Sequence, residues 1–146
     1  MNLTKSDQRT LGRIAAESGL KEFWLGGSHT YLRVAREIGV MFRPADYDLA
    51  IKGSTKIYEL TKQNLKANNF EIIKSRPYYL KFNKAFQIVA KKGLMNLDIA
   101  VVNNLHYLAH FDIESIFWHF PSGKLYDHYN SLDVIKQRKI IPTISV

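Results

Sequence analysis

The sequence predicts an α/β or α+β domain in which a mixed β-sheet is flanked by helices. Helix-like and strand-like segments alternate through residues 4–69, and further strand-like segments follow. An apolar content of 46% and a charged content of 23% are typical of a soluble globular protein. A chain of 146 residues is long enough for one hydrophobic core, so we expect residues 1–146 to form a single domain.

Three segments in the first half show helical periodicity. The first begins at Thr4, a predicted N-cap, and runs to about Glu17, with Gly19 as its stop signal. The second covers 28–39, where a serine precedes apolar residues spaced three and four apart. The third covers 55–69 and ends at an Asn-Asn pair, because asparagine tolerates the left-handed conformation of a helix cap.

Strands are predicted between these helices. The run KEFWLGG at 21–27 indicates a short buried strand that ends at two glycines. The run DYDLAIKG at 46–53 shows a clear alternation, so Asp46, Asp48 and Ala50 share one face of a strand. The apolar residues between them face the other way and would contact the core.

The second half is predicted to be rich in strands. The expected segments are 70–75 (FEIIKS), either 78–83 (YYLKFN) or 85–92 (AFQIVAKK), and 95–102 (MNLDIAVV). In the last segment Asp98 lies on the face opposite the apolar residues Leu97 and Ile99. A hairpin is expected over 116–128 and a short helix over 131–139.

Composition narrows the function classes. The chain has no cysteine, which excludes disulfides, thiolate zinc sites and a cysteine nucleophile, and suits a cytoplasmic location. No apolar run approaches the roughly 20 residues of a membrane helix. The net charge of +8 favours polyanionic partners such as RNA or nucleotide phosphates, although a solvated basic surface is an equally good interpretation.

Three aspartates suggest a metal site. Asp46 and Asp48 stand at i and i+2 on one strand face, and Asp98 is a third acid within another strand. Carboxylates in apolar strands are costly unless a positive charge compensates them. Hard oxygen donors favour Mg²⁺ or Mn²⁺, with substrate phosphates completing the coordination shell.

A glycine turn suggests an anion site nearby. Gly26 and Gly27 let the backbone approach a ligand closely, and Ser28 begins the predicted helix whose N-terminus favours a phosphate. Acidic metal ligands beside a phosphate-binding turn predict a nucleoside triphosphate (NTP) site.

This arrangement resembles the nucleotidyltransferase superfamily with the DNA polymerase β-like fold, in which apolar-Gly-Gly-Ser, a helix, Asp-x-Asp and a later strand aspartate follow one another. The C-terminal part resembles the head domain of bacterial tRNA nucleotidyltransferase and poly(A) polymerase. That family often carries GxLIDPFGGLEDLKNKIIRT, which is similar to GKLYDHYNSLDVIKQRKIIPT at 123–143. The resemblance extends over residues 23–143. The positions that agree in the C-terminal part are Gly123, Leu125, Asp127, Leu132, Ile135, Lys136 and Ile140.

The resemblance implies an enzyme that transfers NMP from an NTP to an acceptor hydroxyl, on RNA or tRNA, with release of pyrophosphate. It implies that Asp46 and Asp48 bind both metal ions. It implies that Asp98 binds the catalytic ion and helps to deprotonate the acceptor hydroxyl.

Further nucleotide contacts follow from the same resemblance. Residues 26–28 would hold the triphosphate, and Asp112 matches the aspartate of the family's RRD stretch, which lies near the sugar of the nucleotide. The arginine of the family's GGxVRD motif is absent here, and Arg33 is the candidate substitute. Lys52, directly after the acidic strand, is another candidate contact to the triphosphate.

The resemblance covers the head domain alone, and we expect no neck or tail domain in this chain. In the family the neck selects CTP or ATP and supplies most of the tRNA contacts, so a helical partner chain or a homo-oligomer is a further expectation. Two alternatives stay open. One is a minimal nucleotidyltransferase that modifies a small molecule, such as an antibiotic, or a protein. The other is a degenerate domain that only binds nucleotide or nucleic acid.

Overall fold

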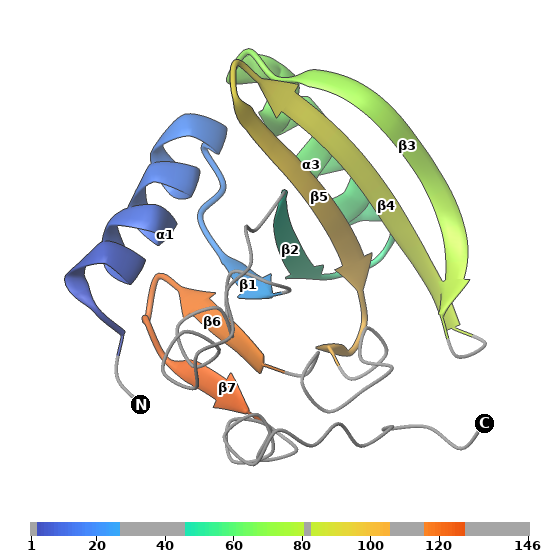
Figure 1. Ribbon diagram of the computed structural model, residues 1–146. Coiled ribbons are helices and arrows are strands. Elements are labelled where there is room, and N and C mark those ends of the chain that lie inside the picture. The colour runs from blue at the N-terminus through green and yellow to red at the C-terminus, as the bar shows by residue number, and fades with distance from the viewer. Residues whose placement is uncertain (1–2, 27–45, 81–82, 106–115, 128–146) are drawn as a thin grey trace.

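The computed structural model describes residues 3–26, 46–80, 83–105 and 116–127 (Figure 1). These residues form an α+β fold with two helices and a seven-stranded mixed sheet. The fold class expected from the sequence is confirmed at this level. Neither helix in the described ranges has the length and apolar character needed to cross a membrane.

The helices are α1 (Lys5–Ser18) and α3 (Thr55–Ala67). The strands are β1 (Phe23–Gly26), β2 (Tyr47–Lys52), β3 (Glu71–Leu80), β4 (Asn83–Lys92), β5 (Met95–Val102), β6 (Ile116–Phe120) and β7 (Leu125–Asp127). Their order across the sheet is β3-β4-β5-β2-β1-β6-β7. In the described sheet β2 and β5 pair in parallel, and every other neighbouring pair is antiparallel.

The predicted caps of α1 are confirmed. The Thr4 hydroxyl accepts a hydrogen bond from the Asp7 backbone N–H (3.1 Å), and the Asp7 carboxylate accepts one from the Thr4 N–H (2.8 Å). This reciprocal capping box satisfies two backbone donors that the first helical turn leaves free. The helix runs to Ser18, one residue beyond the predicted Glu17, and Gly19 is its C-cap as predicted, with φ 72°. The α3 helix ends at Ala67 with Asn68 as its C-cap, next to the predicted Asn-Asn stop, and Asn69 takes the left-handed conformation with φ 67°.

Successive residues of β2 and β5 point to opposite faces of the sheet. Both helices pack on one face and form the main core with the apolar strand residues. The helix residues buried there include Leu11, Ile14, Tyr58 and Leu65, and the strand residues include Leu25, Leu49, Ile88, Leu97 and Ile99. The opposite face carries the acidic residues and a smaller apolar cluster of Ala50, Ala85, Val102, Leu105 and Phe117.

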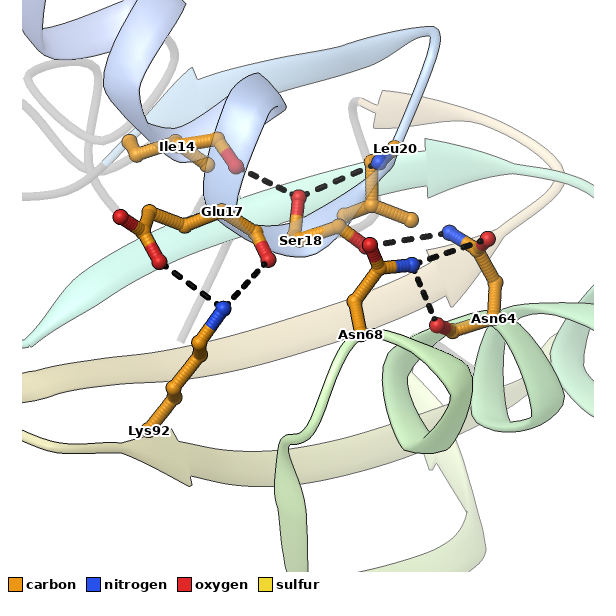
Figure 2. A network of polar contacts seen from close by, with 7 residues as sticks. All are labelled: Ile14, Glu17, Ser18, Leu20, Asn64, Asn68 and Lys92. Carbon is orange, nitrogen blue, oxygen red and sulfur yellow. Dashed lines mark hydrogen bonds and ion pairs between the residues drawn. The ribbon is translucent and has the colours of Figure 1, made fainter.

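A polar network joins the ends of α1 and α3 to β4 (Figure 2). The hydroxyl of fully buried Ser18 donates to the Ile14 carbonyl (2.6 Å), and the Ser18 carbonyl accepts from the Asn64 side chain (3.2 Å). Lys92 on β4 forms an ion pair with Glu17 (2.9 Å). The Asn64 hydrogen bond therefore joins α3 to the end of α1, and the Lys92 ion pair joins α1 to the sheet.

One strand assignment was wrong. The sequence predicted a break after Ser75 and left 78–83 as a possible separate strand, but β3 continues through Pro77 to Leu80. β3 is the outermost strand of the sheet, where the missing N–H of a proline need not remove a hydrogen bond between strands. The alternative segment 85–92 is the correct second strand and lies within β4.

The hairpin predicted near the C-terminal part is confirmed by the antiparallel pairing of β6 with β7. Its turn contains Gly123 with φ 71°, and the Gly123 N–H donates to the His119 carbonyl (2.7 Å). The helices predicted over 28–39 and 131–139 lie outside the described residues.

Candidate metal and nucleotide site

Two aspartates face each other at the centre of the sheet. Asp48 of β2 and Asp98 of β5 are register partners across the parallel pair. Adjacent strands lie roughly 4.8 Å apart, and directly paired residues project from the same face. Asp48 is exposed and Asp98 is half-buried. The fold therefore brings the two carboxylates, here called the acidic pair, together on the face that bears no described helix.

Gly26 extends this row to the next strand, because it is the register partner of Asp48 on β1. A Cβ atom at this position would approach the ring of buried Phe117 to 2.8 Å, a distance that real Cβ atoms essentially never show. Glycine thus lets Phe117 pack directly against the β1 backbone beside the acidic pair.

The electrostatics of the pair are unfavourable without a cation. The pKa of Asp48 is raised from 3.8 to about 6, first by partial desolvation of its carboxylate, then by the charges of Asp98 and Asp46. Burial, together with the charge of Asp98, also raises the pKa of Tyr78 on β3, and nearby Arg76 partly opposes this effect. The negative potential of Asp98 therefore reaches both neighbours, and a bound cation would relieve it.

Asp46 differs from the prediction in one respect. It lies in an exposed bend just before β2 rather than within the strand. Among the described residues, no three His, Cys, Asp or Glu side chains come together as a metal-binding group. The acidic pair nonetheless fits Mg²⁺ chemistry, since this ion is held by one or two carboxylates and takes its other ligands from water and phosphates. The same hard oxygens suit Mn²⁺.

A cation and two aromatic rings lie on the same face. Lys52, at the end of β2, has its Nζ atom 4.8 Å from the centre of the Trp24 ring. The His119 ring on β6 is next to it, because His119 is the register partner of Trp24, and the centres of the two rings are 4.6 Å apart. Lys52 is exposed and follows Asp48 on the same strand face, so it can offer positive charge to an anion near the pair.

Two residues next to Asp98 were missed by sequence reasoning. The Gln87 side chain on β4 donates a hydrogen bond to Asp98 Oδ1 (3.1 Å), and the Arg76 Nε on β3 donates to Gln87 Oε1 (3.1 Å). The only sequence signal was a polar residue inside the apolar run AFQIVA, which is common in strands with one solvated face.

Four further predicted site residues belong to other parts of the chain. Gly27, Ser28, Arg33 and Asp112 lie outside the described residues. Their assignment to nucleotide binding stays a prediction from the sequence.

Comparison with known proteins adds no assignment. No protein-family model matches the chain, and no curated protein is significantly similar to it. The interpretation of the site therefore depends on its residues and their geometry.

The raised pKa predicts how stability depends on pH. The folded protein holds the Asp48 proton up to about pH 6, whereas the unfolded chain releases it near pH 3.8, so this contribution to stability is lost as the pH rises through 6. We expect Asp48→Asn, in metal-free buffer, to raise the free energy of unfolding at pH 7.5 by about 1 kcal/mol. The full shift corresponds to about 3 kcal/mol, which solvent screening at an exposed carboxylate reduces.

Urea unfolding at pH 7.5 and pH 4 in the presence of a chelator measures this effect. The gain should disappear at pH 4, where Asp48 is protonated in the folded state. Glu59→Gln, on the exposed side of α3, is the control and should show no comparable gain at pH 7.5. A less stable Asp48→Asn protein at pH 7.5 would contradict the prediction.

Proposed function

We propose that the protein is a metal-dependent nucleotidyltransferase that transfers NMP from an NTP to an acceptor hydroxyl and releases pyrophosphate. The observation that carries the proposal is the direct pairing of Asp48 and Asp98 on neighbouring parallel strands. The adjacent glycine at position 26 and the basic Lys52 add features that a triphosphate site needs. We propose in addition that the chain has the topology of the DNA polymerase β-like nucleotidyltransferases.

The residues have distinct roles in this reaction. Asp48 and Asp98 would hold Mg²⁺ or Mn²⁺, and the ion would supply charge stabilisation to the reacting phosphates. Asp46, which in the described part of the chain does not join the pair in a three-residue group, would have to approach the ion to act as the further ligand that the resemblance implies. Asp98 accepts the proton of the acceptor hydroxyl, whose oxygen forms a bond to the α-phosphorus. The bond from that phosphorus to the bridging oxygen breaks, and pyrophosphate leaves. Lys52 and residues 26–28 hold the triphosphate, while Arg33 and Asp112 contact the nucleotide.

RNA is the proposed acceptor class. The net charge of +8 supports a polyanionic acceptor, because lysine and arginine side chains gain affinity for phosphates by releasing counterions. The similarity of the C-terminal part to the tRNA nucleotidyltransferase head domain points to tRNA among RNAs.

Pyrophosphate release from each of the four NTPs, with Mg²⁺ and with or without bulk tRNA, tests the proposal. Release that requires both tRNA and Mg²⁺ supports an RNA nucleotidyltransferase and identifies its nucleotide. Release without RNA, combined with a mass increase of one NMP on a protein or an antibiotic, would show that the acceptor is a protein or a small molecule and not RNA. NTP binding without release under any of these conditions would overturn the enzymatic proposal.

A further inference from the structure

We propose that Gln87 is a positioning residue for the Asp98 carboxylate and that Arg76 fixes the orientation of Gln87. These three side chains are called the Arg76–Gln87–Asp98 relay below. The inference deepens the proposed function, because Asp98 is one of the acids assigned to the reaction. Neither Gln87 nor Arg76 is expected to contact the substrate through this role.

The relay crosses three neighbouring strands. Arg76 and Gln87 are register partners on β3 and β4, and Val89, two residues beyond Gln87, is the partner of Asp98 on β5. Gln87 therefore lies diagonally across from Asp98 on the same sheet face, within reach of a long side chain. Its two hydrogen bonds, to Asp98 Oδ1 and from Arg76 Nε, are both 3.1 Å long.

The chemistry of the partners fixes the direction of the Gln87 amide. A guanidinium can only donate hydrogen bonds, so the carbonyl oxygen of Gln87 must face Arg76. The NH₂ group must then face Asp98, where an ionised carboxylate can only accept. A reversed amide would lose both hydrogen bonds, so Arg76 selects the orientation that holds Asp98.

This arrangement restrains Asp98 without neutralising it. A neutral amide donor occupies Oδ1, while the positive charge of Arg76 stays one side chain further away. An arginine bonded directly to Asp98 would form an ion pair and compete with a metal ion for the same charge. The relay instead leaves Oδ2 and the negative charge available to a cation. Residues that hydrogen-bond to metal ligands in other proteins orient those ligands in the same way.

The first test measures the relay without requiring activity. In a ¹⁵N–¹H spectrum the Gln87 side-chain amide is identified by its loss in Gln87→Leu. We expect both Asp98→Asn and Arg76→Ala to shift this resonance. The amide of Gln63, which is exposed on α3, is the internal control and should not move. A Gln87 resonance that is unchanged in both variants would overturn the relay.

The second test measures its consequence. We expect Gln87→Leu to lower kcat for pyrophosphate release by about 10- to 100-fold. The affinity for Mn²⁺, measured by electron paramagnetic resonance, should fall by a similar factor of about 10 to 100. KM for the NTP should change less than about 3-fold, and Gln63→Leu should change neither quantity. Arg76→Ala should lower both by a smaller factor, and Arg76→Lys should restore part of the loss. Arg76 is exposed on the outermost strand, so its variants test the relay even if Gln87→Leu fails to fold.

The two tests separate the relay from the proposed function. Amide shifts as expected in a protein that releases no pyrophosphate and binds no Mn²⁺ would refute the function and leave the hydrogen-bond relay standing as a structural feature, without its positioning role. An active wild type whose kcat and Mn²⁺ affinity are unchanged in folded Gln87→Leu and Arg76→Ala would refute the positioning role alone. A loss of stability without a change in either quantity would have the same meaning.

Discussion

Asp98→Asn is expected to lower the rate of NTP-dependent pyrophosphate release by on the order of 10³-fold. The substitution keeps the shape of the side chain and its capacity to accept a hydrogen bond from Gln87. It removes the negative charge that we propose to bind the cation and the base that we propose to take the acceptor proton. Because Asp98 is only half-buried, the fold should survive the change. Steady-state pyrophosphate assays with Mg²⁺, together with a circular dichroism spectrum of the variant, measure both effects.

The control for this prediction is Glu59→Gln, which makes the same change of charge on α3, on the far side of the sheet. It should retain wild-type turnover. Asp48→Asn should lose activity to a similar extent as Asp98→Asn, since the two carboxylates form one pair. Undiminished turnover in the Asp98→Asn protein would show that the reaction does not need the acidic pair.

Ile99→Ala is expected to lower the free energy of unfolding by about 3 kcal/mol. Ile99 is 0% exposed and is the register partner of Leu49 on one side and Ile88 on the other. Truncation removes buried methyl and methylene groups and leaves a cavity where both helices meet the sheet. Such a loss is a large fraction of the roughly 5–15 kcal/mol that stabilises an ordinary domain. Urea unfolding at equilibrium measures it.

Ile73→Ala is the matched control, because the same chemical change occurs at a residue that is 55% exposed on the edge strand β3. It should cost less than about 1 kcal/mol, since surface substitutions have small effects. Equal losses for the two variants would mean that the core does not lie where β5 places Ile99.

Local sequence patterns were sufficient to predict the faces of the central strands. The alternation in DYDLAIK and MNLDIAVV assigned Asp48 and Asp98 to the face opposite the core, and the sheet confirms it. The capping residues Thr4 and Gly19 likewise predicted the ends of α1. Each of these properties depends on residues a few positions apart, which is the range that periodicity and capping rules describe.

Pairing between distant strands could not be predicted in the same way. Nothing local indicates that Asp48 and Asp98 are register partners, or that β2 and β5 run in parallel. The continuation of β3 through Pro77 could not be predicted either, because the position of this strand at the sheet edge is a property of the whole topology. The contacts of Gln87 and Arg76 could not be predicted for the same reason, since they depend on the neighbouring strands and not on the residues' own segments.

The parallel pairing of β2 with β5 also has a consequence for folding kinetics. Asp48 and Asp98 are about 50 positions apart, and both α3 and the β3–β4 hairpin intervene, so their contact closes a long loop and forms slowly compared with local structure. A refolding chain can complete α1, α3 and that hairpin before the two carboxylates meet. Recovery of the proposed cation binding during refolding should then follow the appearance of the helix signal, and its rate would report when β5 pairs with β2.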